Sequence, residues 1–405
     1  FCDGKRWSGR YSGPAGPEGT GDGTGGGNAN GRGGGNSSAG ANAEYETTVP
    51  GHARRESAAS SSSHNVRPYR NDELKRCMVA VSQTVKPWDT GMFRLVGKLQ
   101  DAVRNKGRVD EMRRSGPDGE RRVAVKRMPS SWVTRGPVEF DEHYPTAPER
   151  PWCDIAIVSE LNRLGFTYVC EFMGVFCDRE YTYVVAELAT RGDLFGWCDL
   201  DPGPGVAREA RMQPLMVQIF SAVKWLHELG VAHRDLSLEN ILLTDVGGDL
   251  QIKVIDFGMC TASQTAQCEV RGKQSYQAPE MHAGDTYDTY LTDTFALGVT
   301  LFAMAAQDYP WTSTKRNACQ LHEYVCMFGF RKFLEKRKLR KGRGEYLMDV
   351  FSPSLVDLLE GLLQRLPRNR TSLGESCFSD SVTGMDRSSV WDMPWMKNAK
   401  PMNDT

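Results

Sequence analysis

The chain has 405 residues, with 50 Lys and Arg against 51 Asp and Glu, so its formal net charge is -1. A balanced charge gives no bulk attraction to nucleic acid or to an anionic membrane, and we expect neither as a partner. We also expect no membrane span, because no apolar stretch reaches the length that a bilayer requires. The 11 cysteines include no Cys-x-x-Cys pair, so we expect reduced thiols and a cytoplasmic or nuclear location. Because the chain begins at Phe1 rather than Met, we expect a fragment or a processed product whose targeting signal is not readable.

Residues 1–66 form a segment of low apolar content that is rich in Gly, Ser and Asn. Such a segment cannot bury enough apolar surface to offset the entropy cost of ordering it. We therefore predict a disordered tail over residues 1–66 and a folded region after it.

Short apolar runs in the next part of the chain predict a region that is rich in strands. Val123-Ala124-Val125-Lys126 predicts one strand, and residues 181–189 predict a second. Between them, a proline-rich insertion over about residues 128–151 predicts a long loop. The aromatic residues of this insertion predict that it packs on the domain. Residues 154–164 then predict a helix.

One segment carries most of the chemistry, His233-Arg234-Asp235-Leu236-Ser237-Leu238-Glu239-Asn240. It follows a predicted amphipathic helix over residues 215–226 and precedes a short apolar strand. The next strand ends at Asp256-Phe257-Gly258. Phosphoryl transfer requires a carboxylate that orients a hydroxyl, and oxygen ligands that hold Mg²⁺ on the phosphates. Asp235, Asn240 and Asp256 supply such a set.

These motifs, with Ala278-Pro279-Glu280 downstream, resemble the catalytic core of eukaryotic protein kinases over roughly residues 90–395. The resemblance implies an α+β, two-lobed fold, with a small β-rich N-lobe over residues 67–187 and a larger helical C-lobe over residues 188–398. It also implies ATP and Mg²⁺ as ligands, a protein substrate, and transfer of the γ-phosphate of ATP to a hydroxyl group. We expect a monomer. The alternative reading is a pseudokinase that binds nucleotide or serves as a scaffold.

The resemblance assigns Asp235 as the catalytic base, and Asn240 and Asp256 as metal ligands. It places Arg234 as a cation behind the base, where its usual partner is a phosphorylated residue of the activation segment. Counting back from Gly272, which follows in the activation segment, that partner is Glu269, which would be a permanent anion. Alternative phosphorylated partners are Thr261, Ser263 and Thr265.

The resemblance also assigns Lys126 to the α- and β-phosphates of ATP. An acid from the predicted helix over residues 154–164 should pair with this lysine. Counting along the helix leaves Asp154 and Glu160 as candidates on neighbouring faces. We favour Asp154, which requires the helix to be shifted by one turn relative to the family pattern.

The resemblance places the hairpin that covers the phosphates at residues 93–103. The three glycines of the family pattern then fall on Gly97, Leu99 and Ala102, followed by Val103. Glycines matter here because bare backbone amides must approach the phosphate oxygens. With one glycine of three, this hairpin should cover the phosphates less closely.

The remaining nucleotide contacts follow the strand at residues 181–189. The resemblance places adenine against the backbone of Glu187 to Ala189. Ala186 falls at the position that gates the pocket behind adenine. Asp193 is placed for the ribose or for the substrate.

Two positions depart from the serine/threonine kinase pattern, which the chain otherwise resembles more than the tyrosine kinase pattern. Ser237 stands where these kinases usually carry Lys, and Lys273 stands where they usually carry Thr. We predict that Lys273 supplies the missing catalytic cation and that Ser237 bonds to Lys273 or to Asp235. Structural roles are implied for Asp293, which should hold the backbone of the catalytic loop, and for a pair between Arg370 and Glu280.

Overall fold

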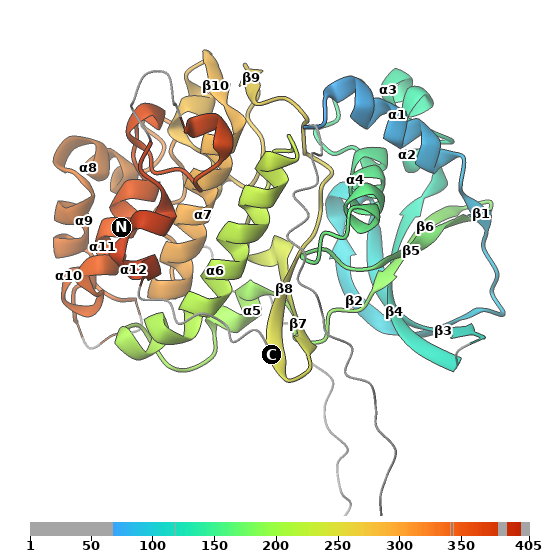
Figure 1. Cartoon of the computed structure of the whole chain (residues 1–405), viewed down its shortest axis with the longest axis horizontal. Helices are drawn as coiled ribbons and strands as arrows, with labels where there is room; N and C mark the ends of the chain where they lie inside the picture. The colour runs from blue at the N-terminus through green and yellow to red at the C-terminus, as the bar shows by residue number, and fades with distance from the viewer. Residues whose placement is uncertain (1–67, 118, 341, 343, 380–386, 398–405) are drawn as a thin grey trace, which may run out of the picture. The chain divides into compact units, whose positions relative to one another are not determined.

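The structure is a computed structural model that describes residues 68–397, apart from residues 118, 341, 343 and 380–386. The disordered tail predicted for residues 1–66 lies outside the described residues. The described chain forms a small lobe built on a sheet and a larger lobe built on helices (Figure 1). This is the two-lobed α+β architecture that the motifs imply.

The small lobe is organised by a six-stranded sheet in the order β1-β5-β6-β4-β3-β2, in which only the β1–β5 pair is parallel. Its strands are β1 (Lys86–Pro87), β2 (Phe93–Ala102), β3 (Gly107–Gly116), β4 (Gly119–Pro129), β5 (Phe172–Cys177) and β6 (Tyr181–Glu187). Side chains alternate between the two faces of a strand. Val123 and Val125 are therefore fully buried in the lobe core, while Ala124 and Lys126 face the opposite side, toward the large lobe.

The insertion after β4 is more ordered than the loop we predicted. It contains two short helices, α2 (Ser130–Val133) and α3 (Pro137–His143). The Trp132 ring lies 5.2 Å from the Phe140 ring and 4.7 Å from the Tyr144 ring, centroid to centroid. The predicted packing of this insertion is confirmed, and the aromatic cluster explains why the segment holds a fixed shape despite its prolines.

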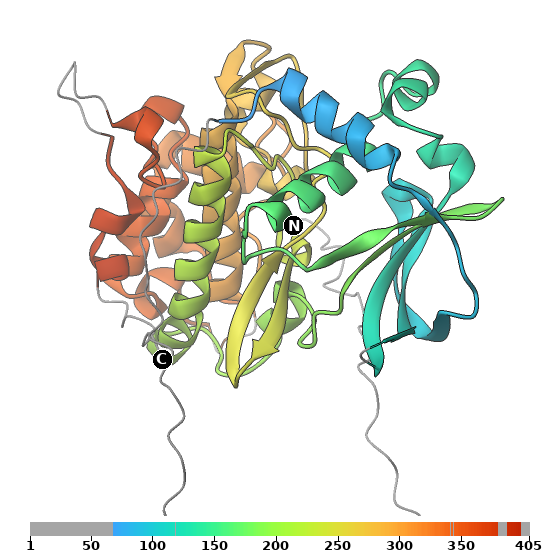
Figure 2. The same ribbon diagram turned by 45° about the vertical axis from the view of Figure 1, so that its right-hand side comes forward.

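Helix α4 (Pro151–Arg163) crosses the small lobe between its sheet and the large lobe. It begins three residues before the predicted helix, because proline is favoured in the first helical turn. Helix α1 (Asn71–Ser82) lies along α4 (Figure 2). Just before α1, the Tyr69 hydroxyl donates to Glu160 Oε2 at 3.0 Å. Glu160 therefore points toward the outer helix.

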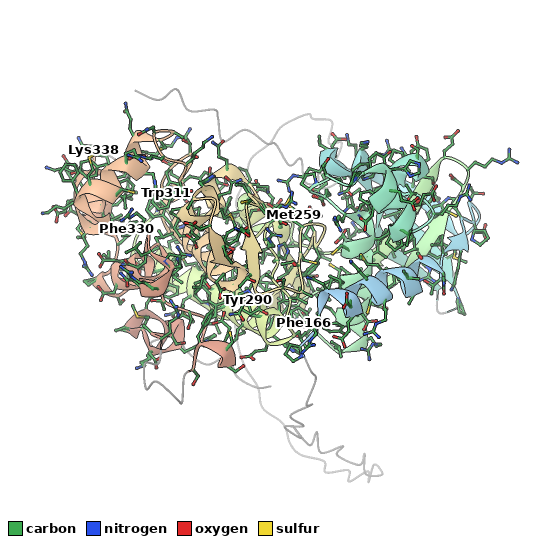
Figure 3. The ribbon with its side chains drawn as sticks, turned by 90° about the horizontal axis from the view of Figure 1, so that it is seen from above. Phe166, Met259, Tyr290, Trp311, Phe330 and Lys338 are labelled. Atoms are coloured by element: carbon green, nitrogen blue, oxygen red, sulfur yellow. The ribbon has the colours of Figure 1, made fainter. Side chains whose placement is uncertain are left out.

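The large lobe is formed mainly by helices, with two small strand pairs at its surface. Its helices are α5 (Leu194–Cys198), α6 (Val206–Glu228), α7 (Thr289–Ala306), α8 (Gln320–Phe328), α9 (Phe330–Lys336), α10 (Leu347–Val350), α11 (Pro353–Leu362) and α12 (Pro394–Lys397). Its strands are β7 (Ile241–Val246), β8 (Asp249–Val254), β9 (Thr265–Gln267) and β10 (Thr286–Asp288). Figure 3 shows Trp311 and Phe330 among the helices of this lobe, both nearly fully buried.

Helix α7 corrects one expectation from the sequence. Its 18 residues are long and apolar enough, by length and composition, to cross a membrane. Every one of these residues is buried inside the large lobe, and the core helix of a globular domain meets the same criteria. We therefore interpret α7 as the central helix of the lobe.

Two predicted sets of polar contacts hold the catalytic region to this core. The carboxylate of Asp293 accepts hydrogen bonds from the backbone N–H groups of His233, at 2.7 Å, and Arg234, at 2.8 Å. The guanidinium of Arg370 donates two hydrogen bonds to the Glu280 carboxylate, at 2.6 Å and 3.0 Å. Both predicted contacts are confirmed, and each satisfies the charge of a buried acid or base.

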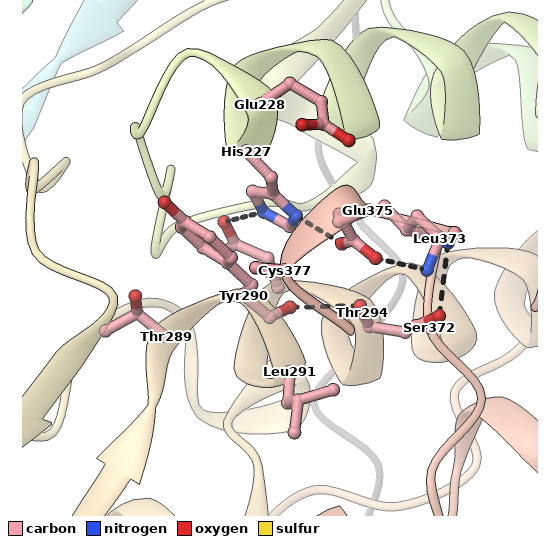
Figure 4. A network of polar contacts seen from close by, with 12 residues as sticks. His227, Glu228, Thr289, Tyr290, Leu291, Thr294, Ser372, Leu373, Glu375 and Cys377 are labelled. Carbon is pink, nitrogen blue, oxygen red and sulfur yellow. Dashed lines mark hydrogen bonds and ion pairs between the residues drawn. The ribbon is translucent and has the colours of Figure 1, made fainter. Parts of the chain in front are cut away.

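A buried histidine, His227, also contacts Asp293. His227 bonds to Asp293 at 3.2 Å through Nε2 and to Glu375 at 2.7 Å through Nδ1. Figure 4 shows Glu375 also accepting a hydrogen bond from the backbone of Leu373. Burial would lower the pKa of His227, but the two carboxylates outweigh burial and raise the pKa to about 9. His227 is therefore a cation at neutral pH.

Candidate active site

The catalytic loop connects α6 to the β7–β8 hairpin, and its backbone is held in an unusual shape. Arg234 and Asp256 both have a φ of 67°, in the left-handed region that few residues other than glycine adopt. The amide nitrogen of Asn240 donates to the backbone carbonyl of Asp235 at 2.7 Å and to Asp235 Oδ2 at 3.1 Å. This orientation leaves the amide oxygen of Asn240 as the atom available to a metal ion.

Lys126 lies between two carboxylates. Its Nζ atom is 2.8 Å from Asp154 Oδ2 and 3.6 Å from Asp256 Oδ1. Burial would lower the pKa of Lys126, but these charges outweigh burial and raise the pKa above its usual value. The same ammonium holds the pKa of Asp256 below its usual value, against the effect of burial. The lysine is therefore charged and fixed where phosphates would arrive.

The structure chooses Asp154 over Glu160 as the acid that pairs with Lys126. Asp154 lies in the first turn of α4, and its Oδ1 atom also accepts a hydrogen bond from the backbone N–H of Phe257 at 2.9 Å. One carboxylate thus connects the lysine to the segment that follows Asp256. The predicted shift of the helix by one turn accounts for this choice.

The hairpin above these residues requires a correction. Strands β2 and β3 pair as far as Ala102 and Gly107, so the turn lies at residues 103–106. Gly97 is in the middle of β2, and a Cβ atom added there would meet nothing within 4 Å. Val103 is in the turn with 80% of its surface exposed. The proposed cofactor roles of Gly97 and Val103 are therefore wrong in position.

The register explains the error. Strand β2 continues to pair with β3 as far as Ala102, through two register shifts between Leu95 and Gln100, so the turn comes later in the chain than the expected position. With the turn at 103–106, the spacing Gly-x-Gly-x-x-Gly-x-Val falls on Ala102, Arg104, Gly107 and Val109. A Cβ atom on Gly107 would lie 1.9 Å from the carbonyl oxygen of Arg127, so only glycine fits. The pair Gly107-x-Val109 is the sequence pattern that indicates this position of the turn.

Arg104, in this turn, contacts the proposed base. Its Nη1 atom lies 2.5 Å from Asp235 Oδ2. The other carboxylate oxygen of Asp235 accepts a hydrogen bond from the backbone N–H of Lys273 at 3.1 Å. Both oxygens of the base are thus engaged by the protein. Sequence reasoning missed Arg104, because it depends on where the turn lies.

The arrangement of lysine, paired acid, base and amide can be compared with known proteins. The sequence model described as "Protein kinase domain" matches residues 121–381, which is more than half of the chain. The chain belongs to the protein kinase family.

Named relatives agree with this assignment. The "Serine/threonine-protein kinase H1 homolog" of Danio rerio is 29% identical over 237 residues, which cover 56% of this chain and 51% of the relative. The "Testis-specific serine/threonine-protein kinase 3" of Mus musculus is 31% identical over 199 residues, 48% of this chain and 68% of the relative. The "cGMP-dependent protein kinase" of Toxoplasma gondii is 29% identical over 213 residues, 53% of this chain and 19% of the relative. The chain thus matches about half the length of the first of these relatives and about a fifth of the last.

The metal position of this kinase fits a divalent cation. Asp256 Oδ1 is buried and accepts no hydrogen bond from the described residues. Within the described ranges, no three His, Cys, Asp or Glu side chains converge closely enough to hold an ion by themselves. Mg²⁺ in kinase sites is usually held by one or two carboxylates together with phosphate oxygens. Asp256 and the Asn240 amide oxygen fit that shared mode of binding.

A further acid was not expected from the sequence. Glu149, at the end of the insertion, is 3% exposed and accepts a hydrogen bond from Asn105 at 3.3 Å. Burial, followed by the charge of Asp256, raises the pKa of Glu149 to about 8. No family motif contains this residue, so only the fold reveals it.

The kinase site also contains the predicted contact between Lys273 and Ser237. Lys273 Nζ donates to Ser237 Oγ at 2.8 Å and lies 2.8 Å from Glu239 Oε2. The contact is as predicted, and Glu239 is a second partner that we did not foresee. The catalytic role of Lys273 stays a prediction.

The activation segment is held by the predicted ion pair. Arg234 Nη2 lies 2.8 Å from Glu269 Oε2 and donates to the Tyr287 hydroxyl at 2.9 Å. Burial would raise the pKa of Glu269, but Arg234 outweighs burial and lowers it. Glu269 is therefore a fixed anion in the segment.

The adenine side agrees only in part with the expected contacts. Ala186 on β6 pairs with Ala124 on β4, so two small side chains lie next to each other there. The backbone N–H of Glu187 donates to Glu171 at 2.9 Å, so adenine would use other backbone groups between Glu187 and Ala189. Asp193 caps α5 by accepting a hydrogen bond from Gly196 at 2.8 Å. This capping is a structural role in addition to the predicted one.

Proposed function

We propose that this kinase is catalytically active and transfers the γ-phosphate of ATP to a serine or threonine hydroxyl of a protein substrate, with Mg²⁺. The observation that carries the proposal is the position of Lys126, 2.8 Å from Asp154 and 3.6 Å from Asp256. Kinase activity requires this lysine–acid pair and the metal-binding aspartate to be in place together. The relatives named as serine/threonine-protein kinases favour that class of hydroxyl acceptor.

Each residue has a defined task in this proposal. Lys126 binds the α- and β-phosphates as a fixed point charge. Asp256 and Asn240 hold Mg²⁺, which neutralises charge on the phosphates when it is bound. Asp235 accepts the proton of the substrate hydroxyl, so Arg104 must first release Asp235 Oδ2.

A peptide library identifies the acceptor. The kinase is incubated with labelled ATP and Mg²⁺ and with peptides that offer only Ser, only Thr or only Tyr as the acceptor. We expect label in the Ser and Thr peptides. Label confined to the Tyr peptides would contradict the assignment of the acceptor.

One observation favours a second candidate function, a pseudokinase that binds nucleotide without transfer. Ala102 and Arg104 stand in place of two glycines, and Arg104 already engages the base. A thermal-shift assay with ATP, in the presence of Mg²⁺ and in its absence, addresses binding. A ligand that binds only the folded state raises the melting temperature by mass action. We expect a larger rise with Mg²⁺, and an equal rise without it would favour the pseudokinase.

A further inference from the structure

The insertion between β4 and α4 brings an acid into the centre of the kinase site. Glu149 comes from this insertion, far along the chain from the catalytic loop, yet only 3% of its surface is exposed. Its Oε2 atom is buried and accepts no hydrogen bond from the described residues, and the nearest cation is Arg104 Nη1 at 3.9 Å. A buried carboxylate oxygen without a hydrogen bond is costly, so a ligand that satisfies it is expected.

Several contacts fix Glu149 against the Asp256 motif. The backbone N–H of Arg150, the next residue, donates to the carbonyl of Gly258 at 2.9 Å. A Cβ atom on Gly258 would lie 2.3 Å from Glu149 Oε1, so the carboxyl group rests directly on this glycine. Burial, and then the negative charge of Asp256, raise the pKa of Glu149, so the two acids lie near each other. The backbone of Arg150 and of Gly258 therefore places this acid beside the metal ligand Asp256.

The insertion also holds the turn at residues 103–106, which we call the phosphate turn, over this acid. The Asn105 amide donates to Glu149 Oε1 at 3.3 Å. The Lys106 ammonium lies 4.2 Å from the centre of the Trp132 ring, in the aromatic cluster of the insertion. The turn and Glu149 thus belong to one packed unit above the catalytic loop.

The charged side chains of this site carry an excess of negative charge that a divalent cation would balance. The described acids of this site are Glu149, Asp154, Asp235 and Asp256, and the described bases that pair with them are Lys126 and Arg104. Beside a bound cation, where the acids would be ionised, four negative and two positive charges leave an excess of two negative charges. A metal ion of charge +2 would balance this excess.

We propose that Glu149 is an additional ligand of the divalent cation, next to Asp256 and the amide oxygen of Asn240. This inference rests on the proposed function, because the same metal ion would hold the phosphates. A second carboxylate at one ion is within the usual range for Mg²⁺. It would strengthen metal binding at a site whose covering turn has lost two of its glycines.

The competing role is structural, because Glu149 accepts a hydrogen bond from Asn105. Glu149→Gln separates the two roles, since glutamine keeps an amide oxygen for Asn105 and loses the charge. The matched control is Glu142→Gln, the same change at an exposed position of the same insertion. Melting temperatures in a metal chelator check folding. Glu149→Gln should melt at the wild-type temperature or above it, because it removes a buried acid.

The test measures Mn²⁺ affinity by electron paramagnetic resonance of the free ion, with a saturating non-hydrolysable ATP analogue. Glu149→Gln should weaken Mn²⁺ binding by about tenfold or more, and Glu142→Gln should leave it unchanged. Glu149→Asp keeps the charge and should lose less affinity than Glu149→Gln. The reverse order of the two variants would contradict the proposal.

The outcomes separate the two claims. Wild-type affinity in Glu149→Gln, within a factor of about two, would overturn the role of Glu149 and leave the proposed kinase function standing. Absence of saturable Mn²⁺ binding by the wild-type protein would overturn both.

Discussion

The guanidinium of Arg104 lies 2.5 Å from the carboxylate of Asp235, so a residue of the phosphate turn contacts the catalytic base directly. The strands β2 and β3 carry Arg104 to this position, and burial alone would lower its pKa. The negative charge of Asp235 outweighs burial, and the pKa of Arg104 is raised. A triphosphate carries more negative charge than one carboxylate, so we expect Arg104 to move to the phosphates when ATP binds.

Arg104→Ala should therefore weaken ATP binding. A hydrogen bond to a charged group contributes about 1.5–3 kcal/mol, so the KM for ATP should rise roughly tenfold or more, with a smaller effect on kcat. Arg104→Lys should recover part of the loss, and Arg121→Ala, at an exposed position of β4, is the control. An unchanged KM with an increased kcat would show that Arg104 only blocks the base.

Lys273 and Ser237 should act as a unit. Loss of a positioned cation from a phosphoryl-transfer site should cost about 10²–10³ in turnover, so Lys273→Thr should be severely impaired. The double variant Lys273→Thr with Ser237→Lys restores the usual arrangement and should recover much of the loss. Near-normal turnover of Lys273→Thr alone would contradict the role of this lysine.

Glu269 should order the activation segment only partly. Its side chain is 43% exposed, and an exposed pair contributes about 0–1 kcal/mol, so Glu269→Gln should reduce activity a few-fold and high salt should weaken the wild type similarly. The measurement compares Glu269→Gln with wild-type enzyme after phosphatase treatment. If phosphatase abolishes activity and Glu269→Gln leaves it intact, a phosphorylated residue is the partner of Arg234.

His227 should make stability dependent on pH. Because its pKa is about 9 in the folded protein and 6.5 for the ordinary side chain, its contribution is fully present below pH 6.5. The contribution is lost as the pH rises through 9, and amounts to on the order of 3 kcal/mol. Chemical denaturation from pH 6 to 10 should show this decline in the wild type and in the exposed-site control His143→Gln. A decline of the same size in His227→Gln would assign it to other groups.

Ala186 should leave space behind adenine. A buried aromatic ring contributes about 1.5–3 kcal/mol, so purine inhibitors with a bulky aryl group should lose about tenfold or more in potency against Ala186→Met. Inhibition constants for wild type and variant decide this. Equal potency would show that Ala186 does not open such a pocket.

The motif residues could be placed from the sequence because short spacing fixes them. Asp235 and Asn240 lie five positions apart on one loop, and Asp256 lies two residues after the end of β8, so local structure brings them together. Asp154 could be favoured but not chosen, since the alternative, Glu160, lies on a neighbouring face of the same predicted helix.

The phosphate turn could not be placed in this way. Its position is set by where the pairing of β2 with β3 ends, at Ala102 and Gly107, and the extent of pairing depends on both strands. Gly107 is required by a close approach of β4, and Glu149 reaches the site through the packing of an insertion. Both residues are fixed by contacts between distant segments; a local pattern, Gly107-x-Val109, marks the first of them, and no local pattern marks Glu149.

The central claim is that Asp235 serves as the base of an active phosphotransferase. The most direct measurement is the initial rate of phosphate transfer from labelled ATP by wild-type protein and by Asp235→Asn, purified in parallel and shown to have the same melting temperature. We predict transfer by the wild type and a loss of about 10²–10⁴ in rate for Asp235→Asn, the usual contribution of a positioned base. Equal rates for the two proteins, or no transfer by either, would contradict the account.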